Sequence, residues 1–214
     1  MRSAFRDHLR QLGRIPATVG YTARGMQRVR RSNRKLSQLT RPFTPPPSFM
    51  NHMITADRRF ATATLALADI KATSKHLGVT INDLVLAISA GALRKLSLRY
   101  DGHADAPLLA SVPMSYDFSP DRISGNKFSG VLVALPVDDE DPLARVQRAR
   151  EAATLGKEGY ELLGPELVSK WAAYLPPKLA ESMFEKLDAL DGQNKVLNLN
   201  ISNVPGPRER GRVG

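Results

Sequence analysis

A capped helix that is apolar on nearly every side constrains this chain most, and it lies in residues 78–96, GVTINDLVLAISAGALRKL. Thr80 and Asp83 form the Thr-x-x-Asp pattern of a capping box, in which each side chain accepts a hydrogen bond from a backbone N–H of the first turn. The residues that follow are almost all apolar, so the pattern predicts a helix from Ile81 to about Tyr100 that is covered on both sides. The apolar run is too short to span a bilayer. A helix of this kind needs a sizeable domain around it.

Composition narrows the chemistry that such a domain supports. The 214 residues include no cysteine, which excludes disulfides, a cysteine nucleophile and a cysteine-ligated metal. The arginine-rich N-terminus is not followed by a continuous apolar stretch, so no signal peptide is expected. We therefore expect a cytoplasmic protein, with peripheral attachment to a membrane or to lipid inclusions as the alternative.

The net charge of +10 is concentrated near the N-terminus. Residues 1–41 contain eleven Lys and Arg against a single acid, whereas residues 42–214 contain twenty residues of each sign. Two interpretations stay open. Residues 1–41 are either a solvated helical connector that packs its few apolar side chains on the main body, or a surface for an anionic membrane or lipid droplet. Nucleic acid is not expected, because no recognisable motif or aromatic interleaving accompanies the arginines.

Local patterns divide the chain into a basic connector at residues 1–44 and a compact domain at residues 45–214. The boundary is set by the proline run 45–47, which predicts an extended linker. After it, strands are predicted at residues 59–67, 107–116, 126–136 and 195–202, and helices at 69–78 with Asp69 as its cap, at 81–100, from Asp141-Pro142 onward, and at 163–175 and 176–190. This order predicts an α/β domain in which a mixed sheet is layered with helices.

Familiar catalytic and metal-binding motifs are absent from the sequence. The four histidines match no ligand spacing; they are His8, His52, His76 and His103. The segment AISAG at 87–91 lies within the predicted helix and not on a strand-to-helix turn, which excludes a nucleophile elbow. The acidic run 138–141 is interpreted as a capping and dipole feature of a helix N-terminus. We expect no metal site and no permanently bound cofactor.

Two polar stretches remain as candidate site residues. The first is Asn82-Asp83, where the capping box explains the Asp and leaves the Asn unexplained. The second is residues 198–207, where the closing strand ends, and it contains Ser202, Asn203, Pro205 and Gly206. For the second stretch the alternative is a rigid turn, in which the prolines fix the backbone and Asn203 bonds to it locally.

Four motifs, two of which overlap these stretches, resemble one protein family. They are T-x-N-D-L-V-L-A-x-x-A-G-A-L-R at 80–94, G-N-x-x-S-G-V-L-V-A-L-P at 125–136, D-P-L-A-R-V at 141–146 and S-N-V-P-G-P-R-E at 202–209. In this order and spacing, the sequence from about Pro45 onward is similar to the C-terminal half of the bacterial wax ester synthase/diacylglycerol acyltransferases. The resemblance implies the C-terminal domain fold of the CoA-dependent (chloramphenicol acetyltransferase-like) acyltransferases, whose two α/β domains meet around a tunnel.

The resemblance implies an O-acyltransferase of neutral-lipid synthesis, which transfers an acyl group from acyl-CoA to diacylglycerol or a long-chain alcohol. In this family the general base is a histidine of an H-H-x-x-x-D-G motif in the N-terminal domain, and the alkoxide attacks the thioester through a tetrahedral oxyanion. The present sequence has no adjacent histidine pair. The resemblance therefore implies that this chain has no catalytic residue of its own and is inactive alone. It also implies that the partner of the chain is a catalytic N-terminal half.

Asn82-Asp83 matches the family's N-D motif near the interdomain tunnel, and residues 202–206 match a motif of the tunnel or of a turn. Relatives continue beyond S-N-V-P-G-P with further elements, so the domain is expected to be incomplete at its end. The competing hypothesis, from a different class, is a non-enzymatic domain that associates with lipid or a membrane surface.

Overall fold

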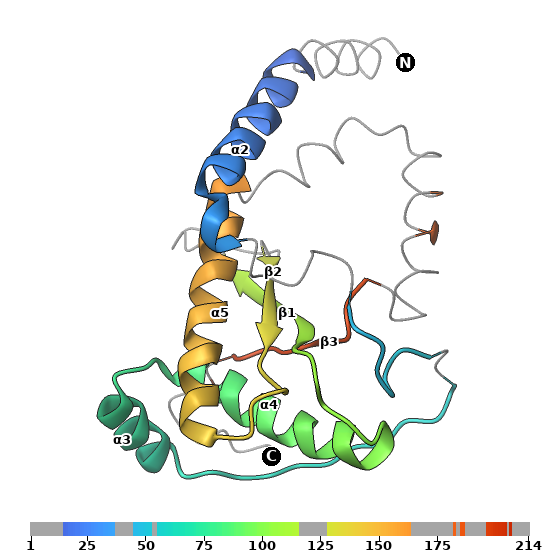
Figure 1. Cartoon of the computed structure of the whole chain (residues 1–214), viewed down its shortest axis with the longest axis vertical. Helices are drawn as coiled ribbons and strands as arrows, with labels where there is room; N and C mark the ends of the chain where they lie inside the picture. Colours follow the sequence, from blue (N-terminus) through green and yellow to red (C-terminus); the bar gives the residue numbers. More distant parts are fainter. Residues whose placement is uncertain are drawn as a thin grey trace, which may run out of the picture.

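The computed structural model describes residues 15–36, 45–52, 55–115, 128–163, 182, 185–186, 196–204 and 206. Its elements are α2 (Ile15–Leu36), α3 (Leu67–Leu77), α4 (Ile81–Tyr100), β1 (Leu108–Ser115), β2 (Phe128–Leu135), α5 (Pro142–Leu163) and β3 (Leu199–Asn200). The long helix α5 runs beside the sheet, with α4 across its lower end and α2 toward its upper end (Figure 1). The predicted mixed sheet layered with helices is confirmed.

Helix α4 begins at the predicted capping box. The Thr80 N–H donates to Asp83 Oδ2 at 2.8 Å, and the Asp83 N–H donates to Thr80 Oγ1 at 3.2 Å. Ahead of it, Gly78 ends α3 with a φ of 66°, a left-handed conformation that favours glycine. The bounds of α4 are those that the sequence predicts.

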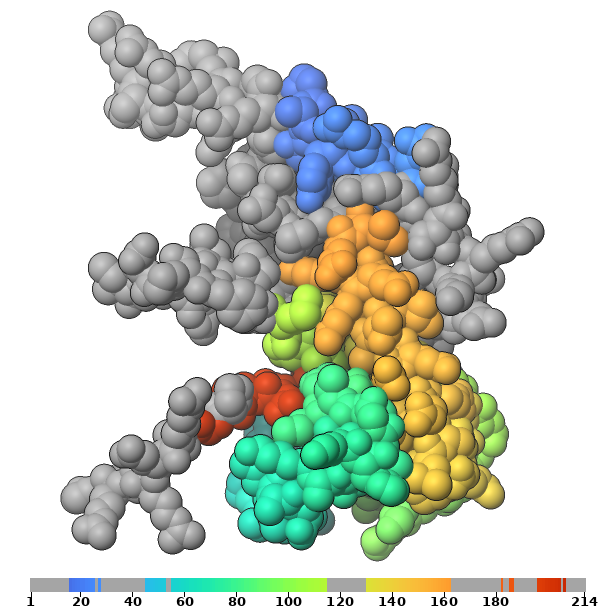
Figure 2. Space-filling model, turned by 90° about the vertical axis from the view of Figure 1, so that its left-hand side faces the viewer, coloured from blue at the N-terminus to red at the C-terminus, as the bar shows by residue number. Residues whose placement is uncertain are grey.

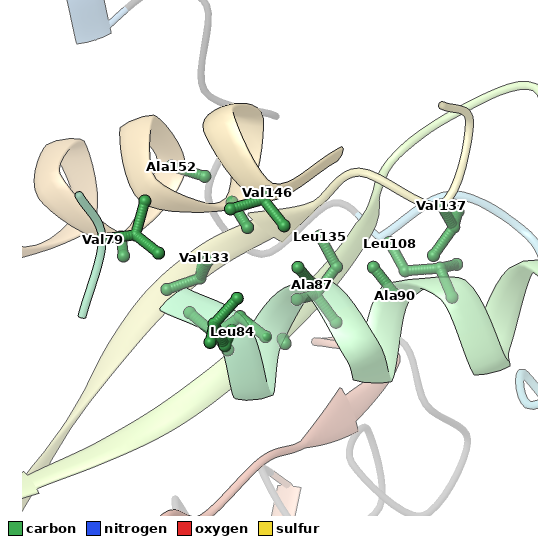
Figure 3. Close-up of a cluster of buried hydrophobic side chains, with 14 of the residues drawn as sticks. Val79, Leu84, Ala87, Ala90, Leu108, Val133, Leu135, Val137, Val146 and Ala152 are labelled. Atoms are coloured by element: carbon green, nitrogen blue, oxygen red, sulfur yellow. The ribbon is translucent and has the colours of Figure 1, made fainter. Parts of the chain in front are cut away.

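The sheet has the order β2-β1-β3, with β1 antiparallel to β2 and parallel to β3. The β1–β2 register places side by side three apolar pairs on one face: Leu108 with Leu135, Ala110 with Val133, and Val112 with Val131. Helices α4 and α5 cover this face and bury their small and aliphatic residues against it (Figure 3), among them Leu84, Ala87, Ala90, Val146, Ala149 and Ala153. This layer is the hydrophobic core, and it fixes where α4 starts relative to the sheet.

The acidic run 138–141 directly precedes α5 and bonds to its first turns. Asp141 Oδ2 accepts a hydrogen bond from the Ala144 N–H at 2.9 Å, which confirms its predicted capping role. Arg148 pairs with Asp138 at 2.9 Å. Burial lowers the pKa of Arg148, but the hydrogen bonds and charges of Asp138 and Asp139 outweigh it, so the pKa lies above its ordinary value. Among the described residues no group of acidic or histidine side chains has the arrangement of a metal site.

The strand predicted at residues 59–67 is wrong. These residues are exposed and form no strand, and α3 already begins at Leu67. The predicted cap is also wrong, because the N-cap is Ala66, which makes no side-chain bond, while Asp69 lies in the first turn. Alternation alone does not make a strand, since the backbone also needs a partner edge.

The covering of α4 also differs from the prediction. The side of α4 that faces the core is buried, but Ile88 is 47% exposed and Leu98 is 46% exposed. The described residues therefore cover α4 on one side only. The second cover, which the resemblance assigns to another domain, stays a prediction. The closing strand is confirmed at residues 199–200, which is much shorter than the predicted 195–202. The predicted helices at 163–175 and 176–190 lie almost entirely outside the described residues.

In the N-terminal part, α2 packs against α5, as the connector interpretation requires. Pro16 lies in its first turn, where a missing N–H is tolerated. In the described part of the chain, no single helix has the length and apolarity to cross a membrane. Helices α3 and α4 together meet that test by length and composition, but they are bent by 101° relative to one another.

Candidate functional site

A buried asparagine fixes the path of the chain that leads to the site. The side chain of Asn198 is 4% exposed. Its Oδ1 accepts from the Leu109 N–H at 2.8 Å, and its backbone N–H donates to the Leu109 carbonyl at 2.9 Å. Its Nδ2 donates to the Pro46 carbonyl at 3.0 Å and to Asn51 Oδ1 at 2.8 Å. Asn198 therefore joins β1, the start of β3 and the proline linker.

From this anchor the chain leads past the first turn of α4. After β3 the Ile201 N–H still bonds to the Ser111 carbonyl at 2.9 Å, and residues 202–204 then leave the sheet. The space-filling view shows the red atoms of this segment beside the green atoms that include α4 (Figure 2). Two stretches that are far apart in the sequence therefore lie together.

The contact between them is an amide pair. Asn203 Nδ2 donates to Asn82 Oδ1 at 3.5 Å, at an exposed position. That distance is at the long limit for an N–H···O bond, so the pair is weak. Within the described residues, the remaining donors of Asn82 and the carbonyl oxygen of Asn203 make no other hydrogen bond. Both amides are thus available to a polar molecule at this position.

An apolar pocket of about 150 Å³ has Asn82 in its lining. It is lined, besides Asn82, by Val112, Pro113 and Met114 of β1, Val131 and Val133 of β2, and Ala153 and Lys157 of α5. Its volume corresponds to about five water molecules at ~30 Å³ each, which is room for part of an alkyl chain. Among the described lining residues, Asn82 and Lys157 are the polar side chains, so the pocket combines an apolar interior with two polar groups.

A buried hydroxyl lies on the same face of α5. Tyr160 follows Ala153 and Lys157 at helical spacing, and its hydroxyl is buried without a hydrogen-bond partner among the described residues. Such groups are uncommon in folded proteins because desolvation is costly. Nothing in the local sequence indicates this, since Tyr at this spacing is also the pattern of an ordinary core residue.

A larger groove of about 570 Å³ lies between α4 and the start of α5. Two of its cations are engaged in structural bonds: Arg94 Nη1 donates to the Val137 carbonyl at 3.0 Å, and Arg145 Nη2 donates to the Asp139 carbonyl at 3.0 Å. Arg94 also pairs with Glu140. The Arg94 bonds hold the acidic run against α4 and the Arg145 bond holds it against α5, so both arginines have a structural role here.

The structure separates the predicted site residues by role. Asp83 is 6% exposed and occupied by the capping box, whereas Asn82 faces the pocket and Asn203. Ser202 and Gly206 are exposed near this pair in the chain, and Pro205 lies outside the described residues. Sequence reasoning placed Asn198 in the second candidate stretch without predicting its anchoring role, and it missed Lys157 and Tyr160. The asparagines at 198 and 200, within a mostly apolar stretch, were the available signal for the first.

Two family models match the chain. The wax ester synthase/diacylglycerol acyltransferase catalytic domain matches residues 1–85, and the C-terminal domain of the same family matches residues 124–214. The first match therefore includes Asn82 and extends past the boundary predicted at residue 44, and the second includes Asn203. The domain division at residues 44 and 45 stays a prediction.

Individual relatives agree with the models. A Mycobacterium tuberculosis (strain H37Rv) protein, provisionally named a diacylglycerol O-acyltransferase, is 70% identical over all of this chain and 46% of its own length. The O-acyltransferase WSD of Acinetobacter baylyi is 32% identical over 78% of this chain and 36% of its own length. The solved wax ester synthase/diacylglycerol acyltransferase of Marinobacter aquaeolei VT8 superposes with a TM-score of 0.55 at 27% identity, over 86% of this chain and 39% of that one. The chain thus spans less than half the length of these relatives.

Proposed function

Because the chain belongs to the wax ester synthase/diacylglycerol acyltransferase family, we propose that it is the part of an O-acyltransferase that forms one wall of the substrate tunnel. The complete enzyme transfers an acyl group from acyl-CoA to diacylglycerol or a long-chain alcohol. The observation that carries the proposal is that Asn82 both lines an apolar pocket and pairs with Asn203.

The pocket suits the chemistry of the substrates. An acyl chain gains about 0.8 kcal/mol for each buried methylene group, and the pocket walls are almost entirely apolar. The polar end of the same substrate, a thioester or an alcohol, needs hydrogen-bond donors and acceptors where the apolar wall ends. Asn82 and Asn203 provide them, and the weak bond between them is easily exchanged for a bond to substrate.

The reaction itself needs a base that this sequence does not contain. In the proposed step the base takes the proton of the acceptor hydroxyl, the oxygen forms a bond to the thioester carbonyl carbon, and the C–S bond breaks as the thiolate of CoA leaves and takes up a proton. No adjacent histidine pair occurs in the 214 residues. The general base is therefore supplied by the partner half of the enzyme, and Asn82 and Asn203 act as positioning residues.

The proposal is tested with a chimera, called here the joined protein, in which this chain replaces the matching region of the 70%-identical M. tuberculosis relative. The joined protein is expected to form triacylglycerol or wax ester from acyl-CoA and diacylglycerol or hexadecanol, measured by thin-layer chromatography. The 214-residue chain alone is expected to give no product above a blank without protein. Product from the chain alone would show that the general base lies within these 214 residues. An inactive joined protein would contradict the proposed function.

The non-enzymatic alternative depends on the basic segment, residues 1–41. It requires binding to vesicles that contain acidic phospholipid, with a steep loss as salt screens charges beyond about 10 Å at ~0.1 M. The packing of α2 on α5 favours the connector interpretation over this alternative. A cytoplasmic location with peripheral attachment to lipid is proposed on the same family basis.

A further inference from the structure

Residues 58–65 form an open stretch of backbone ahead of α3. Every one of them is exposed, and none of their backbone N–H or C=O groups forms a hydrogen bond within the described part of the chain. In Figure 1 the segment is the teal trace that runs below α4 to reach α3. Eight consecutive residues thus have a complete set of free backbone groups, which is what the edge of a sheet binds.

The side chains of this stretch are those of a strand. Ala61, Ala63 and Leu65 fall on one face of an extended chain, and the opposite face has Phe60 with two threonines. Phe60 is 91% exposed and Leu65 is 62% exposed. Large apolar side chains are rarely displayed in this way over a continuous segment unless another surface covers them.

The comparisons indicate where that surface comes from. The segment lies within residues 1–85, which match the catalytic domain of the family, yet the chain spans only 46% of its 70%-identical relative. Most of the sequence that accompanies this segment in the relative is therefore absent from these 214 residues. A strand-like segment with free backbone groups fits a partner that offers a sheet edge.

We propose that residues 58–65 are an interface strand, which adds to the edge of a β-sheet supplied by the rest of the full-length acyltransferase. The main-chain hydrogen bonds of a strand addition provide the affinity, and Phe60 and Leu65 enter apolar sites on the two faces of that sheet. Eight residues is an ordinary strand length. The inference depends on the proposed function in one respect, since it takes the longer protein of the family as the partner.

Hydrogen exchange measured by mass spectrometry tests the strand directly. In the 214-residue chain the amides of residues 58–65 should exchange as fast as those of an unfolded peptide. In the joined protein they should exchange more slowly by at least about tenfold, since paired amides exchange only after local opening. Equal exchange in the two proteins would overturn the proposal. Slow exchange in the chain alone that depends on its concentration would overturn it too, because the partner would then be a second copy.

Proline substitutions identify the hydrogen bonds. Thr62→Pro and Ala63→Pro each remove one N–H, and adjacent N–H groups of a strand point to opposite sides, so at least one of the two must remove a bond to the partner sheet. That variant should lose the slow exchange of the joined protein and lower its unfolding temperature. Ala56→Pro, an equally exposed Ala→Pro change outside the segment, is the matched control and should change neither. The absence of any effect from both Thr62→Pro and Ala63→Pro would contradict the inference.

These readouts do not depend on catalysis. A joined protein that protects residues 58–65 but transfers no acyl group would support the strand and contradict the proposed function. A joined protein that is active but leaves the segment unprotected would support the proposed function and contradict the interface strand. In the isolated chain, the three proline variants should unfold at the same temperature as the parent.

Discussion

Asn203 donates a hydrogen bond to Asn82 across 121 positions of sequence, and the two residues belong to matches with different domains of one family. The bond is long and exposed, so it contributes little to folding. The bond shows that the first turn of α4 and the chain after β3 present their side-chain amides to the same place. Asn82 also lines an apolar pocket. Catalytic-domain and C-terminal-domain sequences therefore meet at one polar point.

The capping box separates the roles of the neighbours Asn82 and Asp83. Asp83→Ala removes the carboxylate that accepts from the Thr80 N–H and should cost about 0.5–2 kcal/mol of stability. Asn82→Ala should cost less, because its amide has only the weak bond to Asn203. Urea unfolding of both variants of the isolated chain checks the order. A larger loss for Asn82→Ala would mean that its amide has a buried partner.

Asn198 should be the most sensitive polar side chain outside the helices. Asn198→Ala leaves the buried Leu109 N–H without its acceptor and frees the Pro46 carbonyl, and each orphaned buried group costs about 1–3 kcal/mol. Asn200→Ala is the matched control, because Asn200 is an exposed asparagine two residues further along the chain and should change stability by less than about 0.5 kcal/mol. Similar losses for the two variants, measured by denaturant unfolding, would show that Asn198 does not anchor the segment.

The close approach of α5 to β2 depends on a glycine. A Cβ at Gly156 would lie 2.7 Å from the Leu132 carbonyl oxygen, so Gly156→Ala should destabilise by about 1–3 kcal/mol. Gly20→Ala, also within a helix, meets only the end of the Arg24 side chain at 4.0 Å and should stabilise by about 0.5–1 kcal/mol. Each kcal/mol should shift the unfolding temperature by about 2–4 °C. If Gly156→Ala unfolds no lower than the parent, the packing of α5 on β2 is looser than described.

The orphaned hydroxyl of Tyr160 gives a prediction of opposite sign. Tyr160→Phe removes a buried group without a partner, so the isolated chain should keep its stability or gain some of the roughly 1–3 kcal/mol that such a group costs. Thermal unfolding of the variant beside the parent measures this. A clear loss of stability would mean that the hydroxyl is hydrogen-bonded in solution.

The predictable parts of the fold were those with a local cause. Thr80 and Asp83 set the start of α4, and Asp141-Pro142 set the start of α5, because caps act within one turn. The strands at β1 and β2 followed from apolar runs. The strand prediction for residues 59–67 failed because an alternating pattern does not indicate whether a partner edge is present. The role of Asn198 and the meeting of Asn82 with Asn203 were out of reach, since both depend on contacts between distant parts of the chain.

The measurement that tests the account most directly is acyl transfer by the joined protein with Asn82→Ala. If Asn82 positions substrate at the tunnel wall, kcat/KM should fall by at least about tenfold, or ~1.4 kcal/mol. The unfolding temperature should change little, and Asn200→Ala should leave both quantities unaltered. Normal turnover by Asn82→Ala, at a temperature where the variant is folded, would contradict the account and reduce the Asn82–Asn203 pair to a feature of the fold.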